Sequence, residues 1–167
     1  MNELLYREFL QLADRHFSGI QHRHRGSFQC QKGCHNCCSP GRTVLKNEAA
    51  NIVAYLFENP ELVQELRTLE DEDPHRGQRC SFLTADGACG IYPVRPFICR
   101  SHGAPIAIER EEYYQIDVCP LNFTHNPIEA LQPEDFFLLD MWNAQLLESV
   151  DDEERIELRI SVLLTSN

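Results

Sequence analysis

The sequence lacks features that define several whole classes of protein. Its 167 residues contain no run of about 18 apolar side chains, which excludes a membrane-spanning helix. Near the start, Glu3, Arg7 and Glu8 interrupt the apolar residues, so the continuous apolar segment of a secretory signal is missing. The eight glycines form no glycine-rich nucleotide loop. These absences predict a cytoplasmic protein with no membrane partner.

Excess positive charge is also missing, because the formal net charge is −11. A chain this acidic is not expected to bind nucleic acid or an anionic membrane. The charge is unevenly spread, however. Residues 15–47 contain six basic residues and no acidic one, and residues 74–108 contain four arginines against Asp86 alone. These two basic windows hold seven of the eight cysteines, and nearby cations favour thiolates over thiols.

Cysteine is less frequent than the ~8–10% that is typical of small disulfide scaffolds, and a chain of this length can bury an ordinary apolar core. Clustered cysteines in a reducing compartment are more often metal ligands or redox catalysts than disulfides. Eight is nevertheless an even number, so a disulfide-bonded interaction module is the alternative that thiol counting would test.

The strongest motif is Cys30-Gln-Lys-Gly-Cys34-His-Asn-Cys37-Cys38, in which Gly33 allows a sharp turn. Thiolates separated by two or three residues can converge on one metal ion. Four further cysteines follow along the chain. The candidate metal ligands are therefore Cys30, Cys34, Cys37, Cys38, Cys80, Cys89, Cys99 and Cys119.

The adjacent pair Cys37 and Cys38 complicates a site with one ion. Neighbouring side chains in an extended segment point to opposite sides. The pair could face two ions, bridge a binuclear centre, or consist of one ligand and one buried thiol. Eight thiolates would serve two sites of four cysteines each, and fewer ligands are also compatible with the sequence. His35 and His102 are expected beside the metal or at the surface rather than among its ligands.

Helices are expected to dominate the fold. Residues 47–57 and 60–69 are predicted as helices, the first capped by Asn47 and the second opened by Pro60. The cysteine-rich residues 28–41 have no hydrophobic period and predict loops and turns. A first helix is predicted to end near Ser18 and Gly19. Its apolar positions are Leu4, Leu5, Phe9, Leu12 and Phe17.

Short strands are expected beside the cysteines. Asp86-Gly87 predicts a tight hairpin turn between residues 80–83 and 88–92, and residues 104–108 and 113–118 predict a second pair of strands.

The C-terminal region, about residues 133–164, is predicted to be helical. One helix is expected to begin at Pro133, and a last helix over residues 156–164 to follow the acidic residues 151–154. The predicted fold is α+β and mainly helical: one domain over residues 1–167, with a cysteine-rich loop region and short β-hairpins around a metal centre.

Together the motifs resemble the CxxCxxCC cysteine-cluster family, which is often called YkgJ-like and described as zinc- or iron-chelating. The similarity covers about residues 28–123. Its first cysteine gap is three residues here instead of two. The matching segments are Phe28-x-Cys30-x3-Cys34-x2-Cys37-Cys38, Cys80-x-Phe82-Leu83, Gly87-x-Cys89-x-Ile91-Tyr92, Arg95-Pro96-x-x-Cys99-Arg100 and Cys119-Pro120-x-Asn122.

The resemblance implies a metal-binding protein with zinc as its cofactor, or alternatively an iron–sulfur cluster, since both take thiolate ligands. The family is similar to a domain of flagellin lysine methylases. The alternative function is therefore an iron–sulfur redox or methyl-transfer-related enzyme or accessory protein. No nucleophile, base and orienting partner are arranged by the sequence, so no catalytic residue is assigned, and the protein partner is unknown.

Overall fold

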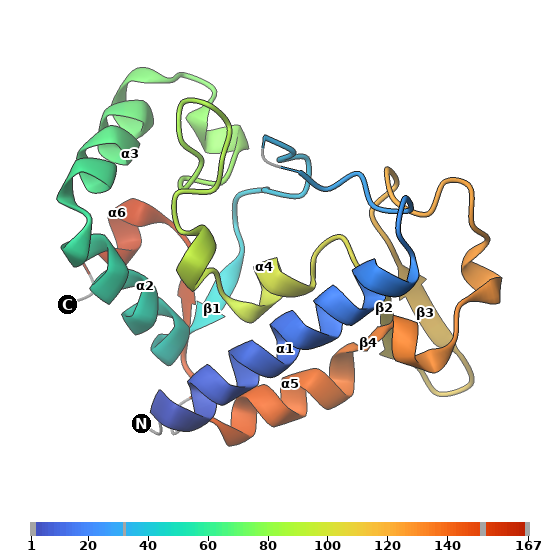
Figure 1. Ribbon diagram of the computed structural model, residues 1–167. Coiled ribbons are helices and arrows are strands. Elements are labelled where there is room, and N and C mark those ends of the chain that lie inside the picture. The colour runs from blue at the N-terminus through green and yellow to red at the C-terminus, as the bar shows by residue number, and fades with distance from the viewer. Residues whose placement is uncertain (1–2, 32, 151–152, 166–167) are drawn as a thin grey trace. The chain divides into compact units, whose positions relative to one another are not determined.

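The computed structural model describes residues 3–31, 33–150 and 153–165. The described residues form mainly helices with short strands in small sheets (Figure 1), which confirms the predicted α+β, mainly helical class. The chain divides into two compact units. Unit 1 comprises Met1–Cys30 and Phe97–Asp151, and unit 2 comprises Gln31–Pro96 and Asp152–Asn167. Lys32 of the first basic window, and Asp151 and Asp152 of the acidic residues before the predicted last helix, lie outside the described residues.

Unit 1 is built on the long helix α1, which contacts two later helices. In Figure 1, α1 and α5 lie side by side. The helices of this unit are α1 (Glu3–Arg23), α4 (Phe97–Ser101) and α5 (Leu139–Glu148), with 3-10 turns η3 (Ile128–Ala130) and η4 (Pro133–Asp135).

The predicted buried face of the first helix is wrong in part. Leu4, Leu5 and Leu12 are exposed, whereas Tyr6 and Ala13 are buried. The buried positions of α1 are Tyr6, Phe9, Leu10, Ala13 and Ile20, and they follow the helical period of 3.6. The helix also continues through Ser18 and Gly19 to Arg23.

The core of unit 1 is a cluster of aromatic rings. Phe97 packs edge-on against Phe9 at a centroid distance of 5.1 Å, and Phe137 lies 5.1 Å from Trp142. His16 joins the cluster through Phe137, at 4.7 Å. The first and last of these pairs are edge-to-face and the second is tilted, and favourable aromatic pairs add about 0.5–1.5 kcal/mol each beyond the burial of their area.

A three-stranded sheet completes unit 1. β2 (Ile106–Glu109) pairs antiparallel with β3 (Tyr114–Asp117) and parallel with β4 (Phe137–Leu138). The predicted pair of strands over residues 104–118 is therefore confirmed. Phe137 belongs to β4 and not to a helix, so the predicted helix from Pro133 is wrong at its start. Pro133 opens only the turn η4, and the helix begins at Leu139.

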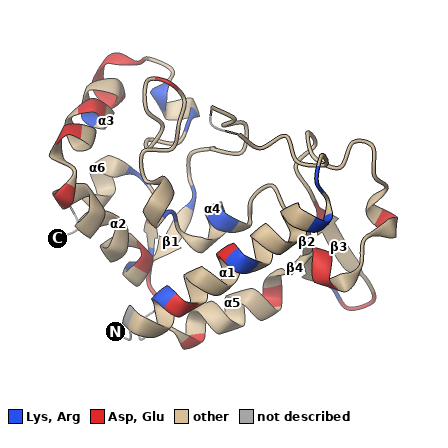
Figure 2. Ribbon diagram, viewed as in Figure 1, with Lys and Arg blue, Asp and Glu red and all other residues tan. Residues whose placement is uncertain are grey.

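Unit 2 contains two consecutive helices and a two-stranded sheet. α2 (Lys46–Glu58) is followed directly by α3 (Pro60–Glu72). Pro60 opens α3 as predicted. The predicted cap of the preceding helix is wrong, because Leu45 is the residue before α2 and Asn47 lies inside the helix. The predicted end of α3 at residue 69 is wrong, because the helix continues through the acidic residues Glu70 and Asp71 to Glu72. Figure 2 shows the acidic residues along this helix.

The two-stranded sheet of unit 2 joins distant parts of the chain. β1 (Thr43–Leu45) pairs antiparallel with β5 (Arg155–Glu157), and the short helix α6 (Ile160–Leu163) follows. The predicted last helix is therefore wrong over residues 156–159, because β5 gains its backbone partners from β1. The elements of this unit also include the 3-10 turns η1 (Arg76–Gln78) and η2 (Tyr92–Val94).

The predicted hairpin around Asp86 is wrong in its extent. Leu83 and Cys89 form an isolated antiparallel bridge, and the loop between them is longer than a two-residue turn. Gly87 adopts a positive φ of 75°, a conformation that favours glycine. The prediction of loops and turns over residues 28–41 is confirmed for its described residues.

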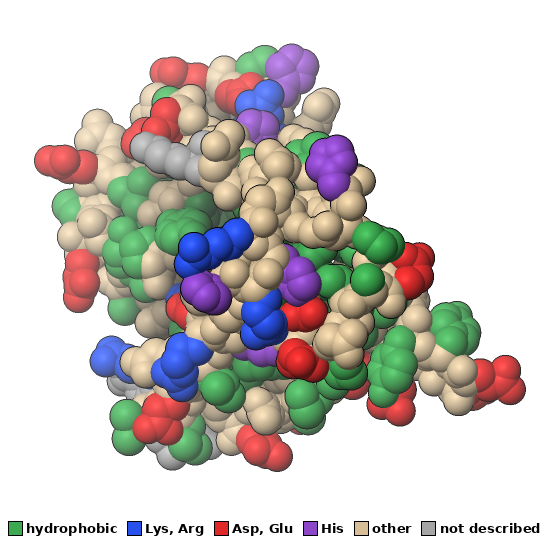
Figure 3. Space-filling model, turned by 45° about the vertical axis from the view of Figure 1, so that its right-hand side comes forward, with side chains coloured by type: hydrophobic (Ala, Val, Ile, Leu, Met, Phe, Trp, Pro, Cys, Tyr) green, Lys and Arg blue, Asp and Glu red, His purple; other side chains and the backbone are tan. Residues whose placement is uncertain are grey.

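None of the helices in the described ranges is long and apolar enough to cross a membrane. On the face drawn in Figure 3, acidic side chains are interspersed with basic and hydrophobic ones. The negative net charge therefore does not form a uniformly acidic surface on that face.

Candidate metal centre

Two loops of unit 2 bring four of the eight predicted ligands near one another. The first loop carries Cys37 and Cys38 and ends before β1; the second carries Cys80 and Cys89. The backbone N–H of Cys80 donates a hydrogen bond to the carbonyl oxygen of Cys38 at 2.9 Å. This bond fixes the two loops together at two predicted ligands. We refer to Cys37, Cys38, Cys80 and Cys89 as the thiol cluster.

Cys37 and Cys38 do not point to opposite sides. The N–H of Cys38 donates to the carbonyl oxygen of His35 at 2.8 Å, which makes this segment a turn instead of an extended chain. The two side chains are hydrogen-bonded to each other. The argument that adjacent cysteines must diverge therefore does not apply here.

The hydrogen bond between the two side chains shifts the pKa values of Cys37 and Cys38 in opposite directions. The Cys38 side chain stabilises the thiolate of Cys37 and lowers its pKa to about 6, against the opposing effect of burial, and Arg42 and His35 lower the pKa further. The same hydrogen bond raises the pKa of Cys38 above its ordinary value. Burial and the charges of Cys37, Cys80 and Cys89 act on Cys38 in the same direction. The pair thus favours one thiolate and one thiol while no cation is bound.

Cys80 and Cys89 are half-buried, as Cys38 is, whereas Cys37 is exposed. Burial raises the pKa of Cys80, opposed by a backbone hydrogen bond and by the positive charges of Arg76 and Arg42. Burial likewise raises the pKa of Cys89, with repulsion from Cys80 and Cys37 adding to it and Arg95 opposing it. The four sulfurs therefore lie within electrostatic reach of one another, and further ionisation is limited by burial and mutual repulsion.

Three arginines surround the thiol cluster. Arg42 also donates a hydrogen bond from Nη2 to the carbonyl oxygen of Cys37 at 2.9 Å. Arg76 and Arg95 act electrostatically on Cys80 and Cys89. All three belong to the basic windows, whose predicted role was to offset thiolate charge. The basic windows do not predict which cysteine each arginine affects, because the loops that carry them meet only in the folded chain.

The donor set suits zinc or iron by its chemistry. Thiolates are preferred ligands of both metals, and a bound cation would offset the repulsion among the thiolates, which contributes to the raised pKa of Cys38 after its hydrogen bond with Cys37 and its burial. The side chains are not arranged in a closed coordination geometry. Among the described residues, no three His, Cys, Asp or Glu side chains are positioned to hold one metal ion.

Three other predicted ligands, Cys30, Cys99 and Cys119, belong to unit 1. Cys99 lies on α4, and Cys119 accepts a backbone hydrogen bond from Asn122 at 2.9 Å. Cys34 belongs to unit 2, where its N–H donates to the carbonyl oxygen of Gln31 at 2.9 Å. All eight cysteines are present as thiols and none forms a disulfide.

Asn122 fixes the position of Cys30 and is the residue whose role the sequence did not reveal. Its side chain is 3% exposed. Nδ2 donates to the sulfur of Cys30 at 3.3 Å and to the carbonyl oxygen of Gly103 at 2.7 Å, while Oδ1 accepts from the N–H of Gln29 at 2.8 Å. A Cβ at Gly103 would lie 2.8 Å from the Cys30 sulfur, so glycine is needed for this approach.

The histidines have different surroundings. The Nδ1 atom of His102 hydrogen-bonds to the carbonyl oxygen of Ile98 at 2.7 Å. The His24 ring is half-buried, and its Nε2 lies 2.9 Å from the Asp135 carboxylate. His35 lines a cavity of unit 2.

A comparison with family models gives one match. The model of CxxCxxCC, described as "Putative zinc- or iron-chelating domain", matches residues 29–120. No curated protein and no solved structure matches the chain. The matched residues include all eight cysteines and cover more than half of the sequence. The chain therefore belongs to the CxxCxxCC family of zinc- or iron-chelating domains.

Proposed function

We propose that Cys37, Cys38, Cys80 and Cys89 are the ligands of a zinc or iron centre. The observation that carries this proposal is their mutual electrostatic influence across two loops that the Cys80 to Cys38 hydrogen bond joins. Arginines that favour thiolates and partial burial are the surroundings that a thiolate metal centre requires. The family supports the choice of zinc or iron.

A bound metal would supply a divalent or cluster charge that holds all four sulfurs as thiolates. The chain's own contribution is the arrangement of its loops. Arg42 holds the carbonyl of Cys37, and Arg76 donates from Nη2 to the carbonyl oxygens of Ser81 and Leu83 at 2.7 and 2.6 Å. These contacts order the backbone beside Cys37 and Cys80, and the centre would have at least a structural role.

For Cys30, Cys34, Cys99 and Cys119 the ligand role stays a prediction from the sequence, as does the cytoplasmic location. The iron–sulfur redox or methyl-transfer-related alternative is distinguished from a zinc centre by the spectrum. A brown protein that absorbs near 400 nm and bleaches on reduction would favour it.

The test is metal analysis of anaerobically purified protein. We expect wild type to contain zinc or iron, and Cys80→Ser with Cys89→Ser to lose the metal of the thiol cluster. Cys119→Ser changes a thiol outside the cluster and is expected to retain that metal. Circular dichroism of each variant checks that it folds. A folded double variant with the metal content of wild type would refute the assignment.

A further inference from the structure

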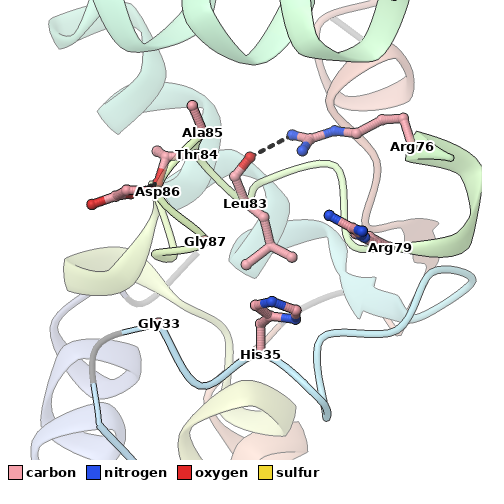
Figure 4. Close-up of a pocket in the computed structure, with 9 residues that line it drawn as sticks. All are labelled: Gly33, His35, Arg76, Arg79, Leu83, Thr84, Ala85, Asp86 and Gly87. Atoms are coloured by element: carbon pink, nitrogen blue, oxygen red, sulfur yellow. Dashed lines mark hydrogen bonds between the residues drawn. The ribbon is translucent and has the colours of Figure 1, made fainter. Parts of the chain in front are cut away.

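A small cavity of unit 2 lies beside the two loops of the thiol cluster. Its volume is about 220 Å³. Three segments line it: Gly33 and His35, Arg76 and Arg79, and residues 83–87 (Figure 4). The cavity is thus lined by two guanidinium groups and an imidazole, with Asp86 as its acidic residue.

Arg76 is buried without a carboxylate partner. Its side chain belongs to a residue that is 6% exposed, and Nη2 makes both of its hydrogen bonds to backbone carbonyls. Nε is buried and has no hydrogen-bond partner among the described residues. Burying a cation without a charged partner is costly, and burial accordingly lowers the pKa of Arg76, against the opposing attraction of Cys80 and nearby acids. Arg76 is thus a buried cation at the wall of the cavity, without an ion pair in the described part of the chain.

Arg79 and His35 line the same cavity. Within the described ranges, neither the Arg79 guanidinium nor the His35 ring makes an ion pair or a hydrogen bond. The His35 ring is held close to Gly87, where an added Cβ would lie 3.2 Å from its Cδ2 atom. In Figure 4, Arg79 and His35 flank the Leu83 side chain.

Asp86 does not neutralise this group of cationic donors directly. Its Oδ1 atom accepts hydrogen bonds from the Thr84 hydroxyl and from the N–H of Ala88, the latter at 3.3 Å. Figure 4 shows its carboxylate directed away from His35 and Arg79. The Asp86 carboxylate therefore stabilises the turn over residues 84–88. It does not neutralise the positive charge of Arg76 and Arg79 at the cavity.

We propose that this cavity binds a small tetrahedral oxyanion, either free phosphate or the phosphate group of a larger molecule. The exposed Arg79 would supply charge-assisted hydrogen bonds, His35 a ring N–H, and the buried Arg76 positive charge. The site goes beyond the proposed metal centre, because it needs the guanidinium groups and not the thiolates.

Equilibrium dialysis with radiolabelled inorganic phosphate tests the site on the full chain as purified, at constant ionic strength. We expect saturable binding by wild type that sulfate displaces and acetate does not. Displacement by O-phosphoserine in addition would identify a phosphate group on a larger molecule as an acceptable ligand. Arg79→Ala should weaken binding by about tenfold or more, in line with the loss of a charge-assisted hydrogen bond.

Two further variants keep this test decisive. Arg79→Lys retains the charge and should bind more tightly than Arg79→Ala. Arg67→Ala removes an exposed arginine of α3 that does not line the cavity and should bind as wild type does. Equal binding by wild type and Arg79→Ala, or no saturable binding, would overturn the proposal.

Metal content measured on the same samples separates this site from the metal centre. If phosphate binds to the metal itself, Arg79→Ala should bind phosphate as wild type does, and that result would refute the proposed cavity site. Metal without phosphate binding would refute the cavity alone, whereas phosphate binding in a folded chain that carries no metal would refute the metal centre alone.

Discussion

The aromatic core of unit 1 and the thiol cluster of unit 2 show two different ways to order a chain. In unit 1, Phe9, Phe97, Phe137 and Trp142 exclude water by packing, which is favourable without any bound group. In unit 2, the cysteine-bearing loops contain short 3-10 turns and one isolated bridge. Their sulfurs oppose one another's ionisation. A bound metal would therefore contribute most to the order of unit 2, whose cysteine-bearing loops have the least regular structure.

Metal removal should give the largest effect and should separate the two regions. We expect a strong chelator, applied anaerobically, to increase amide hydrogen exchange over residues 79–91 and 33–42. Structural zinc contributes about 10–16 kcal/mol in small zinc domains, so protection in these loops should be largely lost. Exchange in α1 and α5 should change little. Hydrogen exchange with mass spectrometry measures both regions in one sample, and unchanged protection of the loops in verified metal-free protein would refute the comparison.

Phe137→Ala should have the opposite effect to metal removal: it should destabilise unit 1 and leave the metal centre intact. Phe137 is fully buried and contacts His16, Phe97 and Trp142, so truncation should cost about 3–5 kcal/mol of unfolding free energy. Denaturant unfolding followed by the fluorescence of Trp142, the only tryptophan, measures this loss. The metal content should stay that of wild type. Phe57→Ala, at a side chain that is 71% exposed, is the control and should change stability by less than about 0.5 kcal/mol.

Asn122→Ala tests a polar contact of unit 1 that also reaches a cysteine. The substitution removes three hydrogen bonds and leaves the N–H of Gln29 and the carbonyl of Gly103 with one partner fewer. We expect a loss of about 2–3 kcal/mol and faster alkylation of Cys30, both measured against Gln64→Ala on α3. Wild-type stability together with an unchanged alkylation rate would contradict this role.

The smallest expected effect is a shift in the pH dependence of Cys37 alkylation. This measurement tests the thiol cluster in metal-free protein. In metal-free protein, the alkylation rate of Cys37 should rise with pH through a midpoint near 6 instead of the ordinary 9.0. Because the folded pKa is lowered, the stabilisation from this thiolate is complete above the unfolded pKa. It declines as the pH falls and is lost through the folded pKa.

Cys38→Ala removes the hydrogen bond that lowers this pKa most, so the midpoint should move up toward the ordinary value. Cys38→Ser keeps a donor and is the matched control, with a smaller expected shift. An unchanged midpoint in Cys38→Ala would show that the two side chains are not hydrogen-bonded.

The features that the sequence predicted correctly depend on local signals. Pro60 opens α3 because proline suits the first helical turn, and residues 28–41 lack the periodicity of a helix or strand. The strand β5 was missed because its hydrogen-bond partners lie in β1, far away in the sequence. The exposed Leu4, Leu5 and Leu12 misled the assignment of the buried face of α1, since hydrophobic residues also occur at surfaces.

The candidate site was likewise only partly predictable. The cysteine spacing and the basic windows predicted thiolates with nearby cations. The grouping of Cys38 with Cys80 depends on a hydrogen bond between two loops, and the contact of Asn122 with Cys30 depends on the close approach of Gly103. Neither contact leaves a periodic signal in the sequence, because both connect irregular segments.

X-ray absorption at the metal edge of the anaerobically purified protein tests the central claim most directly. The edge identifies zinc or iron, and the fine structure counts the neighbouring sulfur atoms. For zinc we predict four sulfur neighbours at about 2.3 Å, and fewer of them in a folded variant with Cys80→Ser and Cys89→Ser. A first shell of nitrogen and oxygen atoms, or a sulfur count that this double variant leaves unchanged, would contradict the account.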